Sequence, residues 1–537
     1  MPVITKFGGL IPRMSEHSKP IGLASEAVNV SLCNGRVEPW RERAYLYPAV
    51  TECKSFFLRD CCLYSWDACV EATDYLVDFG RLFLTGRSSR PEVTPTKSCG
   101  SNYTYLGVPA PTNVLTVSGA ESYGETSDAR SYVYTYINGY GEESAPSPAS
   151  RQLTVKDGSP VTVSGFATPP EGWGIVGMAL YRTATGSRVS DEELQNQEPV
   201  TNYFMVTMDI ALTSFTDTVL TRDLGLILTT EDDRLPPETL RHIQTINNTG
   251  ILMGVTRNQV HFSNNFQPWN WPARNDITVP YNIVNACSLD TKVFVSTDAK
   301  PFIIDMSNTC DPNQLRPIQD ADVPLPDISC GRPHSAIVTP FGMVYSSPDG
   351  LVLFNSQGQW SLLTAPWYSA VEWRLIRPDT AILAYWNGMI FCSTEIITFV
   401  LQIDLELYKS YDSGQLSTIS DKPDDMFVTK AGELLMLEDD AIWQWNAGNT
   451  YRKYLWASAY MDFPSDISPT ALKVKTKGVT ATLQAPNGLS YTRFAGEKPI
   501  RLGRLGRHDQ YRVILEGDQP VDYLELGTAT MTLGQGV

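Results

Sequence analysis

A short β-strand pattern that returns along the chain constrains its fold most strongly. In each copy, a turn leads into a strand of alternating or continuous apolar residues, and Ser, Asp or Asn ends it. Five copies occupy residues 260–263, 302–305, 351–355, 389–393 and 442–446. Their first residues are 38 to 53 positions apart. Repeats of roughly 40–50 residues that contain only short strands are typical of β-propeller blades.

An earlier copy of the pattern, at residues 82–86, lies 178 positions before Val260. That gap is long enough to hold a domain inserted between two blades. We therefore expect residues 51–107 to form a first blade. An independent layer of β-hairpins is the alternative for this range.

The gap has its own strand pattern. Residues 132–137 alternate in polarity and lead into a turn and a Pro-Ser run, and further strands are predicted at 161–163, 178–182 and 203–206. Strands separated by turns over about 120 residues are typical of an immunoglobulin-like or fibronectin-III-like sandwich. We assign this sandwich to residues 108–229.

The rest of the chain completes an all-β, multi-domain organisation. Residues 1–50 are predicted to form an extended segment pinned to another surface, with a two-residue hairpin turn at Asn34–Gly35. Residues 230–455 should hold the remaining propeller blades, entered through a Leu-Pro-Pro linker. Residues 456–537 return to polar alternation and predict a small C-terminal β domain.

Composition supports this organisation and limits the function. The 537 residues include 38 Gly and 36 Pro, which suits many turns between strands. The net charge of −17 argues against a general nucleic-acid binder that grips phosphates. The charge is uneven, because residues 450–537 carry 11 Lys or Arg and 8 Asp or Glu. Their net charge of +3 leaves −20 on residues 1–449.

Targeting, metal and cofactor signals are weak. The N-terminus has no apolar core of signal-peptide length, and no apolar run approaches the roughly 18 residues of a membrane helix. We expect a soluble protein made in a cytosol. The ten cysteines show no Cys-x-x-Cys spacing and the five histidines are scattered. The sequence therefore predicts buried free thiols, no metal site and no cofactor.

The sequence offers no convincing catalytic set, so we predict that the chain is not an enzyme. The acidic pairs Glu142–Glu143 and Asp439–Asp440 fall in turn-like contexts, which favours solvated turns over general acid–base pairs. A sialidase-like propeller should carry Ser-x-Asp-x-Gly boxes, but Ser347-Pro348-Asp349-Gly350 places Gly directly after Asp. A glycosidase remains the third hypothesis for function.

A basic run near the C-terminus is the one candidate contact site. It consists of Arg501, Arg504, Arg507 and Arg512. Arginines at spacing three could line a channel, contact DNA phosphates or pair with an acidic neighbouring subunit. A solvated face or salt bridges between subunits is the favoured interpretation over direct phosphate contact.

The order of several motifs resembles the tail nozzle, or tail tubular, proteins of short-tailed bacteriophages and their prophage relatives. In chain order the motifs are Phe7–Arg13, Ala27 with Asn29, Gly35–Pro39, Tyr134–Ser144 with Pro146 and Ser147, Leu180–Thr183, Phe215–Thr218, Leu235–Pro237, Val260–Ser263, Pro268–Pro272, Cys330 with Phe341–Val352, Trp373 and Pro378. The resemblance covers most of the chain and is weakest at residues 51–107 and 456–537. Because each motif alone is a strand–turn pattern, their collinear order carries the resemblance.

The resemblance implies a structural virion protein. Such a nozzle is typically a homohexamer below the portal and adaptor rings, and genomic DNA is retained by it and ejected through it. It implies contacts with portal–adaptor proteins and with tail fibre or spike proteins, assembly in the host cytoplasm, and no stable membrane insertion. Double-stranded DNA would pass without specific binding, since an acidic tube repels the DNA backbone. Six copies would carry roughly −100 in total.

The alternative function is a receptor-binding or glycan-binding tail propeller. Its motivation is the aromatic-rich stretch Trp269-Asn270-Trp271. Packing between blades is the structural explanation for the same tryptophans. Loss of glycan binding on Trp269→Ala would separate the two explanations.

Overall fold

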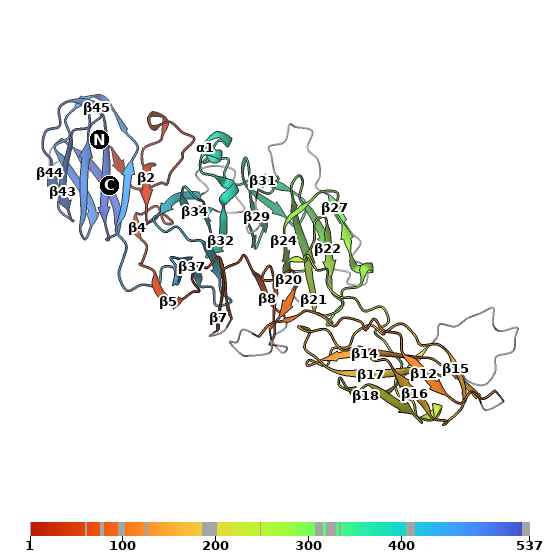
Figure 1. Ribbon diagram of the computed structural model, residues 1–537. Coiled ribbons are helices and arrows are strands. Elements are labelled where there is room, and N and C mark those ends of the chain that lie inside the picture. The colour runs from red at the N-terminus through yellow and green to blue at the C-terminus, as the bar shows by residue number, and fades with distance from the viewer. Residues whose placement is uncertain are drawn as a thin grey trace. The chain divides into compact units, whose positions relative to one another are not determined.

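The computed structural model describes residues 2–59, 62–75, 80–94, 102–123, 127–184, 201–246, 249–306, 315–317, 329–331, 335–403 and 414–528. In these ranges the chain is built from many small β-sheets, so the all-β prediction is confirmed (Figure 1). Their helices are α1 (Ala370–Leu375) and the short 3-10 turns η1 (Glu16–Ser18), η3 (Thr221–Asp223), η4 (Ala273–Asn275) and η5 (Pro378–Thr380). The chain divides into two compact units, Met1–Val70 with Pro280–Val537, and Glu71–Val279.

The first unit contains four antiparallel arrays of four strands each, of which the third is one end of a 10-stranded sheet. They are β24 (Ile283–Leu289), β25 (Lys292–Thr297), β26 (Phe302–Asp305) and β27 (Leu315–Pro317); β28 (Ala336–Thr339), β29 (Gly342–Ser347), β30 (Gly350–Asn355) and β31 (Trp360–Leu362); β32 (Ile382–Trp386), β33 (Met389–Ser393), β34 (Thr398–Ile403) and β35 (Gly414–Ile419); and β36 (Asp425–Val428), β37 (Leu434–Glu438), β38 (Ala441–Gln444) and β5 (Ala44–Pro48). The last array is thus completed by a strand from the N-terminal part of the chain.

Successive arrays of this unit pack face to face. Their first strands lie side by side in the order β24, β28, β32 and β36. Apolar side chains of neighbouring arrays form shared layers, such as the contact of Phe294 on β25 with Phe354 on β30. Central strands such as β29 and β30 are buried on both faces and are therefore continuous apolar runs, which explains the pattern seen in the sequence.

The second unit holds two more four-stranded antiparallel sheets. They are β8 (Glu71–Asp74), β9 (Leu82–Thr85), β10 (Glu92–Val93) and β11 (Thr104–Tyr105), and β20 (Arg241–Ile246), β21 (Ile251–Val255), β22 (Gln259–Phe262) and β23 (Ile277–Thr278). Their first strands β8 and β20 also lie side by side. Each of the six copies of the sequence pattern coincides with a strand. Two copies, β9 and β33, are the second strand of their array, and the other four copies are the third strand of theirs.

The predicted first-blade range, 51–107, contains more than one sheet. Its first part is a separate hairpin of β6 (Ser55–Arg59) and β7 (Cys62–Trp66), which lies in the first unit. The four-stranded sheet of this range begins only at Glu71. The hairpin packs against the array of β36, β37 and β38, and the four-stranded sheet of this range covers residues 71–105.

A β-sandwich occupies the middle of the second unit. Its sheets are β12 (Thr116–Gly119) with β16 (Val161–Ser164) and β19 (Ser214–Asp217); β13 (Ser127–Arg130) with β15 (Leu153–Lys156); and β14 (Tyr132–Asn138) with β17 (Ile175–Thr183) and β18 (Asn202–Asp209). One hydrophobic core lies between them, and Val161 and Val163 face it while Thr162 is exposed. Residues 132–137, whose polarity alternates in the sequence, behave differently, because β14 is buried on both faces from Tyr132 to Tyr136.

The Pro-Ser run protects the open edge of β14. The backbone N–H groups of Ser150, Ser147 and Ser144 donate to the carbonyls of Tyr132, Tyr134 and Tyr136, respectively. The Oγ atoms of the same serines accept hydrogen bonds from the N–H groups of the same tyrosines. Each serine thus satisfies both groups of one tyrosine, and the intervening prolines have no N–H to leave unpaired.

The N-terminal segment is built into the C-terminal β domain. Strand β1 (Val3–Ile4) joins the sheet of β46 (Val521–Gly527), β41 (Ala471–Thr476) and β44 (Ile500–Arg501), and β2 (Ala24–Val28) pairs with β39 (Tyr454–Ser458) (Figure 1). Strand β39 continues into β45 (His508–Gly517), β42 (Val479–Gln484) and β43 (Ser490–Ala495), and β40 (Met461–Ile467) also pairs with β45. Trp456 packs edge-on against Phe7 and donates to the carbonyl of Gly8. The N-terminal segment therefore contacts the C-terminal β domain through two short strands and through Phe7 and Gly8.

The two-residue turn predicted at Asn34–Gly35 is wrong in length. Strands β3 (Val30–Ser31) and β4 (Glu38–Pro39) do pair, but six residues connect them. Gly35 donates to the Leu32 carbonyl and its own carbonyl accepts from Phe7. The loop is longer because it also bonds to the N-terminal segment, which local sequence does not reveal.

Candidate functional site

The predicted basic run divides into two environments. Arg501, Arg504 and Arg507 are exposed, while Leu502 and Leu505 between them are buried, so spacing three does place these arginines outward. None of the three has an ion-pair partner among the described residues. Arg512 differs, because its Nε donates to Gln484 Oε1 at 2.7 Å and its Nη1 lies 3.7 Å from Glu26 Oε1.

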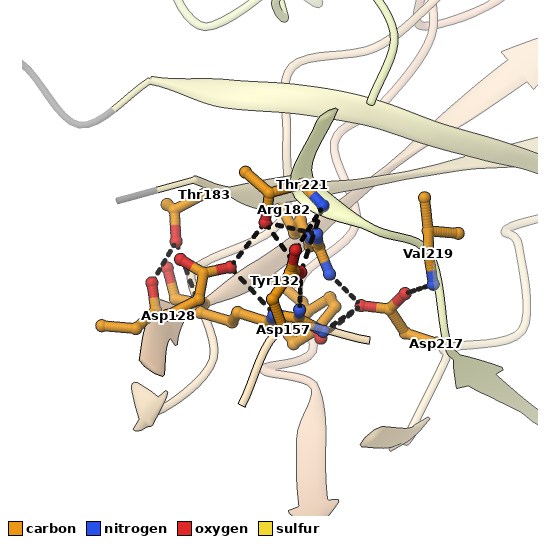
Figure 2. Close-up of polar contacts among 11 residues, drawn as sticks. Asp128, Tyr132, Asp157, Arg182, Thr183, Asp217, Val219 and Thr221 are labelled. Atoms are coloured by element: carbon orange, nitrogen blue, oxygen red, sulfur yellow. Dashed lines mark hydrogen bonds and ion pairs between the residues drawn. The ribbon is translucent and has the colours of Figure 1, made fainter. Parts of the chain in front are cut away.

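A buried charge network, which we did not predict, lies in the sandwich. Asp217 Oδ2 accepts hydrogen bonds from Arg182 Nη1 at 2.7 Å, Arg130 Nη1 at 3.3 Å and Tyr132 Oη at 2.7 Å (Figure 2). The side chains of Arg130, Arg182 and Asp217 are fully buried. Val219 N–H donates to the second carboxylate oxygen of Asp217. Asp217 is therefore the centre at which two buried arginines are neutralised.

Two further carboxylates complete this network, which we call the Arg130–Arg182 network. Arg130 donates through Nε to Asp128 and through Nη2 to Asp157, at 3.0 and 2.8 Å. Thr221 donates to both carboxylates and receives a hydrogen bond from Arg182 (Figure 2). Burial opposes ionisation of Asp157, but hydrogen bonds from Thr221 and the Arg130 charge hold its pKa below the usual value. The network joins strands from different sheets and has the character of a structural clamp.

Motifs that are far apart in the sequence meet in this network. Arg182 belongs to the stretch Leu180–Thr183 and Asp217 to the stretch Phe215–Thr218, both quoted for the phage-tail resemblance. The only signals for this pair in the sequence were a single arginine, Arg182, and a single aspartate, Asp217, in two separate motifs. Their pairing requires strand register, which the sequence alone does not give.

A second meeting of motifs occurs beside helix α1. Trp373 is fully buried and donates from Nε1 to the Ser347 carbonyl at 2.8 Å, and Ser346 Oγ donates to the Pro378 carbonyl. The helix begins with a capping box formed by Ser369 and Glu372. Residues 346–347 thus contact α1 and η5 directly.

The acidic pair Glu142–Glu143 is not a solvated turn. Glu142 is 3% exposed and forms an ion pair with the buried Arg81, with a Nη1–Oε1 distance of 2.5 Å. Glu143 accepts hydrogen bonds from Thr135 and Tyr181. The prediction was wrong because the partner of Glu142 lies 61 residues away. Asp439 and Asp440, by contrast, are exposed and have the positive φ angles of a tight turn.

The cysteine prediction holds in part. Cys53, Cys287, Cys330 and Cys392 are buried free thiols, whereas Cys33 and Cys69 are exposed and Cys62 is disulfide-bonded. The described residues contain no group of three or more His, Cys, Asp or Glu side chains placed to hold a metal ion. A hydroxyl–imidazole–carboxylate chain links Thr256, His261 and Asp276, with both contacts at 2.8 Å. The ring of His261 is buried in this chain, which fits a satisfied core histidine.

The aromatic stretch Trp269-Asn270-Trp271 folds inward. Trp271 is 3% exposed and donates to the Pro268 carbonyl. The Asn270 side chain is buried and bonds to the Arg234 N–H and to Asp233. These contacts support the packing explanation of Trp271, whereas Trp269 is only partly buried.

Asp233 should make stability depend on pH. Burial, helped by the carboxylates of Glu143 and Asp232, raises the pKa of Asp233 to about 6. Since the unfolded value is about 3.9, the folded state binds the proton more tightly. The resulting destabilisation is absent below about pH 4 and complete above about pH 6. We expect the free energy of unfolding to fall over this range by about 1–2 kcal/mol, after allowing for solvent screening.

The variant Asp233→Asn should remove this component of the pH dependence and be more stable than the original chain at pH 7. Thermal unfolding of both chains between pH 4 and 7.5 measures the difference. Asp223→Asn is the matched control, because Asp223 is 59% exposed and is not among the groups that raise the pKa of Asp233. Parallel pH profiles for the original chain and Asp233→Asn would contradict the expectation.

Comparisons with known proteins leave the identity of the chain open. No protein-family model matches the sequence, and no curated protein matches it. Solved structures that it resembles include the extracellular domain of the one-component system BT4673 from B. thetaiotaomicron, with 10% identity, a TM-score of 0.30, and coverage of 88% of this chain and 47% of that one. The chain thus spans about half the length of that structure.

Two further structures give similar values. Hsv2 from Kluyveromyces marxianus shows 10% identity and a TM-score of 0.25 over 57% of this chain and 70% of its own. PorZ, a surface component of the type-IX secretion system of Porphyromonas gingivalis, shows 9% identity and a TM-score of 0.26 over 90% and 70%. Likenesses at this level assign neither domain arrangement nor function. No helix in the described ranges is long and apolar enough to cross a membrane.

Proposed function

We propose that the six four-stranded arrays are blades of one β-propeller and that residues 108–229 form an immunoglobulin-like insertion in it. The adjacent first strands and shared apolar layers of successive arrays support this arrangement. The array of β36, β37 and β38 is completed by β5 from the N-terminal part of the chain, which also supports this arrangement. A ring of blades is closed when one blade combines strands from the beginning and the end of the propeller sequence.

We further propose that the chain is a structural subunit of a phage tail nozzle. In this function it forms a ring, in the homohexameric form typical of such nozzles, below a portal–adaptor complex. Genomic DNA is retained by the ring and ejected through it without specific binding. The other partners are tail fibre or spike proteins, and the location is the virion tail after assembly in the host cytoplasm.

One observation carries this proposal. Motifs quoted for the resemblance, although far apart in sequence, contact one another: Arg182 pairs with Asp217, and Trp373 donates to Ser347. These contacts support the proposal, because they give a physical reason for the motifs to occur together in one chain. The charge of −20 on residues 1–449 adds support, since a negative wall repels DNA phosphates and lets the duplex slide.

Electron microscopy of the purified protein and of virions tests the proposal. The expected result is six-fold rings of this chain, located in the tail directly below the portal. At side-chain resolution the same maps would show whether the six arrays close into one propeller. Monomers at every concentration, together with absence from virions, would overturn the nozzle function. Copies found only on peripheral fibres would favour the receptor-binding or glycan-binding alternative.

A further inference from the structure

One sheet edge of the C-terminal domain is open as far as the described residues extend. Strand β43 is the last strand of its sheet and pairs on one side with β42 only. No other strand of the described chain pairs with its outer side. An open edge offers unpaired N–H and C=O groups, which makes it a template for another chain.

Apolar side chains accompany this edge. Phe494 on β43 is 71% exposed and Leu489, just before it, is 56% exposed. Tyr491 lies against the backbone of Gly503, where a Cβ atom would come within 2.5 Å of the ring. The loop that carries the arginines is therefore packed onto β43, and together they form one surface. We call residues 488–508 the basic edge.

The charge of the basic edge is opposite to that of the rest of the chain. It contains Arg493, Lys498, Arg501, Arg504 and Arg507 and one acidic residue, Glu497, all exposed. Its net charge is +4, so the remaining residues carry −21. The Arg493 guanidinium lies 4.7 Å from the centre of the Tyr491 ring, and within the described ranges none of the five cations is ion-paired to a carboxylate.

We propose that the basic edge binds an acidic surface of a second copy of this chain. Two basic edges repel each other, so like-with-like pairing of β43 strands is disfavoured. An acidic surface attracts the edge, and the rest of a second copy carries a net charge of −21. Exposed Phe494 and Leu489 fit a protein partner, because a contact with DNA phosphates alone uses no apolar surface.

The contact is heterologous, since different surfaces of the two copies meet. Heterologous contacts produce closed rings when the rotation between copies closes. This inference deepens the nozzle proposal by naming a surface through which copies contact one another. It rests on the nozzle proposal in one respect, because that proposal is the reason to expect copies of this chain to assemble with one another.

The test is sedimentation velocity of the full chain at about 50 mM and 500 mM salt, where screening differs strongly. The test variant is Arg501→Glu, Arg504→Glu and Arg507→Glu together. The matched control, Lys156→Glu, Lys422→Glu and Lys453→Glu, changes the net charge equally at exposed lysines elsewhere. A second variant, Phe494→Ser, probes the apolar part without changing charge. Circular dichroism and thermal unfolding establish that each variant is folded.

The expected result is salt-sensitive assembly of the original chain and of the control. The triple arginine variant should assemble at least about tenfold more weakly, and Phe494→Ser should also weaken assembly. Original-strength assembly of a folded triple variant would overturn the inference while leaving the nozzle proposal intact. An original chain that never assembles would overturn both. Binding to duplex DNA that is lost in the triple variant while assembly is unchanged would assign the edge to nucleic acid instead.

Discussion

Asp217→Asn should destabilise the sandwich by about 3–5 kcal/mol. This carboxylate is fully buried and accepts hydrogen bonds from Arg130, Arg182 and Tyr132. The substitution keeps the size of the side chain but removes the charge that compensates the two arginines. Breaking a buried ion network by removing one partner leaves an uncompensated buried charge, which accounts for the large effect.

Hydrogen exchange of strands β14 and β17 in the full chain is the appropriate measurement, because a multi-domain chain need not unfold in one step. Asp223→Asn is the matched control. Asp223 is 59% exposed and 3.7 Å from Arg222, so its loss should change stability by less than about 0.5 kcal/mol. A second variant that combines Asp217→Asn with Arg182→Met should recover part of the loss. An effect of Asp217→Asn below about 1 kcal/mol would contradict the clamp function of the network.

Trp373→Ala should cost a similar amount, about 3–5 kcal/mol, in the other unit. The indole is fully buried in a core that includes Tyr368 and Phe399. Truncation removes this packing and leaves a cavity, and it also leaves the Ser347 carbonyl without its indole donor.

Two variants separate these contributions. Trp373→Phe keeps most of the packing and loses the hydrogen bond, so we expect a loss of about 1–2 kcal/mol. Leu375→Ala changes the same helix at a side chain that is 71% exposed, and its effect should stay within about 0.5 kcal/mol. Hydrogen exchange of β30 and β33, whose side chains line the same core, measures all three. Equal losses for Trp373→Ala and Leu375→Ala would show that α1 is not anchored through this side chain.

Local patterns predicted the elements of this fold well. The alternation of the sandwich strands and the apolar runs such as 351–355 follow from whether one or both faces of a strand are covered. The outward direction of Arg501, Arg504 and Arg507 likewise follows from local spacing, because the leucines between them are drawn into the core.

Contacts between distant residues account for what the sequence did not reveal. Glu142 looked like a turn residue because its partner Arg81 lies on another element, and the turn around Gly35 is longer because Phe7 bonds to it. The Arg130–Arg182 network was missed for the same reason, since its carboxylates come from Asp128, Asp157 and Asp217 on separate segments.

The sequence by itself determined the all-β class and most strand positions, because both depend on how apolar residues are spaced within short stretches of the chain. It also determined the charge contrast between residues 1–449 and 450–537. Only the tertiary structure decided which charges are buried as pairs and which strand edge of the described chain stays open. Those properties depend on strand register and on contacts across hundreds of residues, and many sequences with the same local periodicity would satisfy them differently.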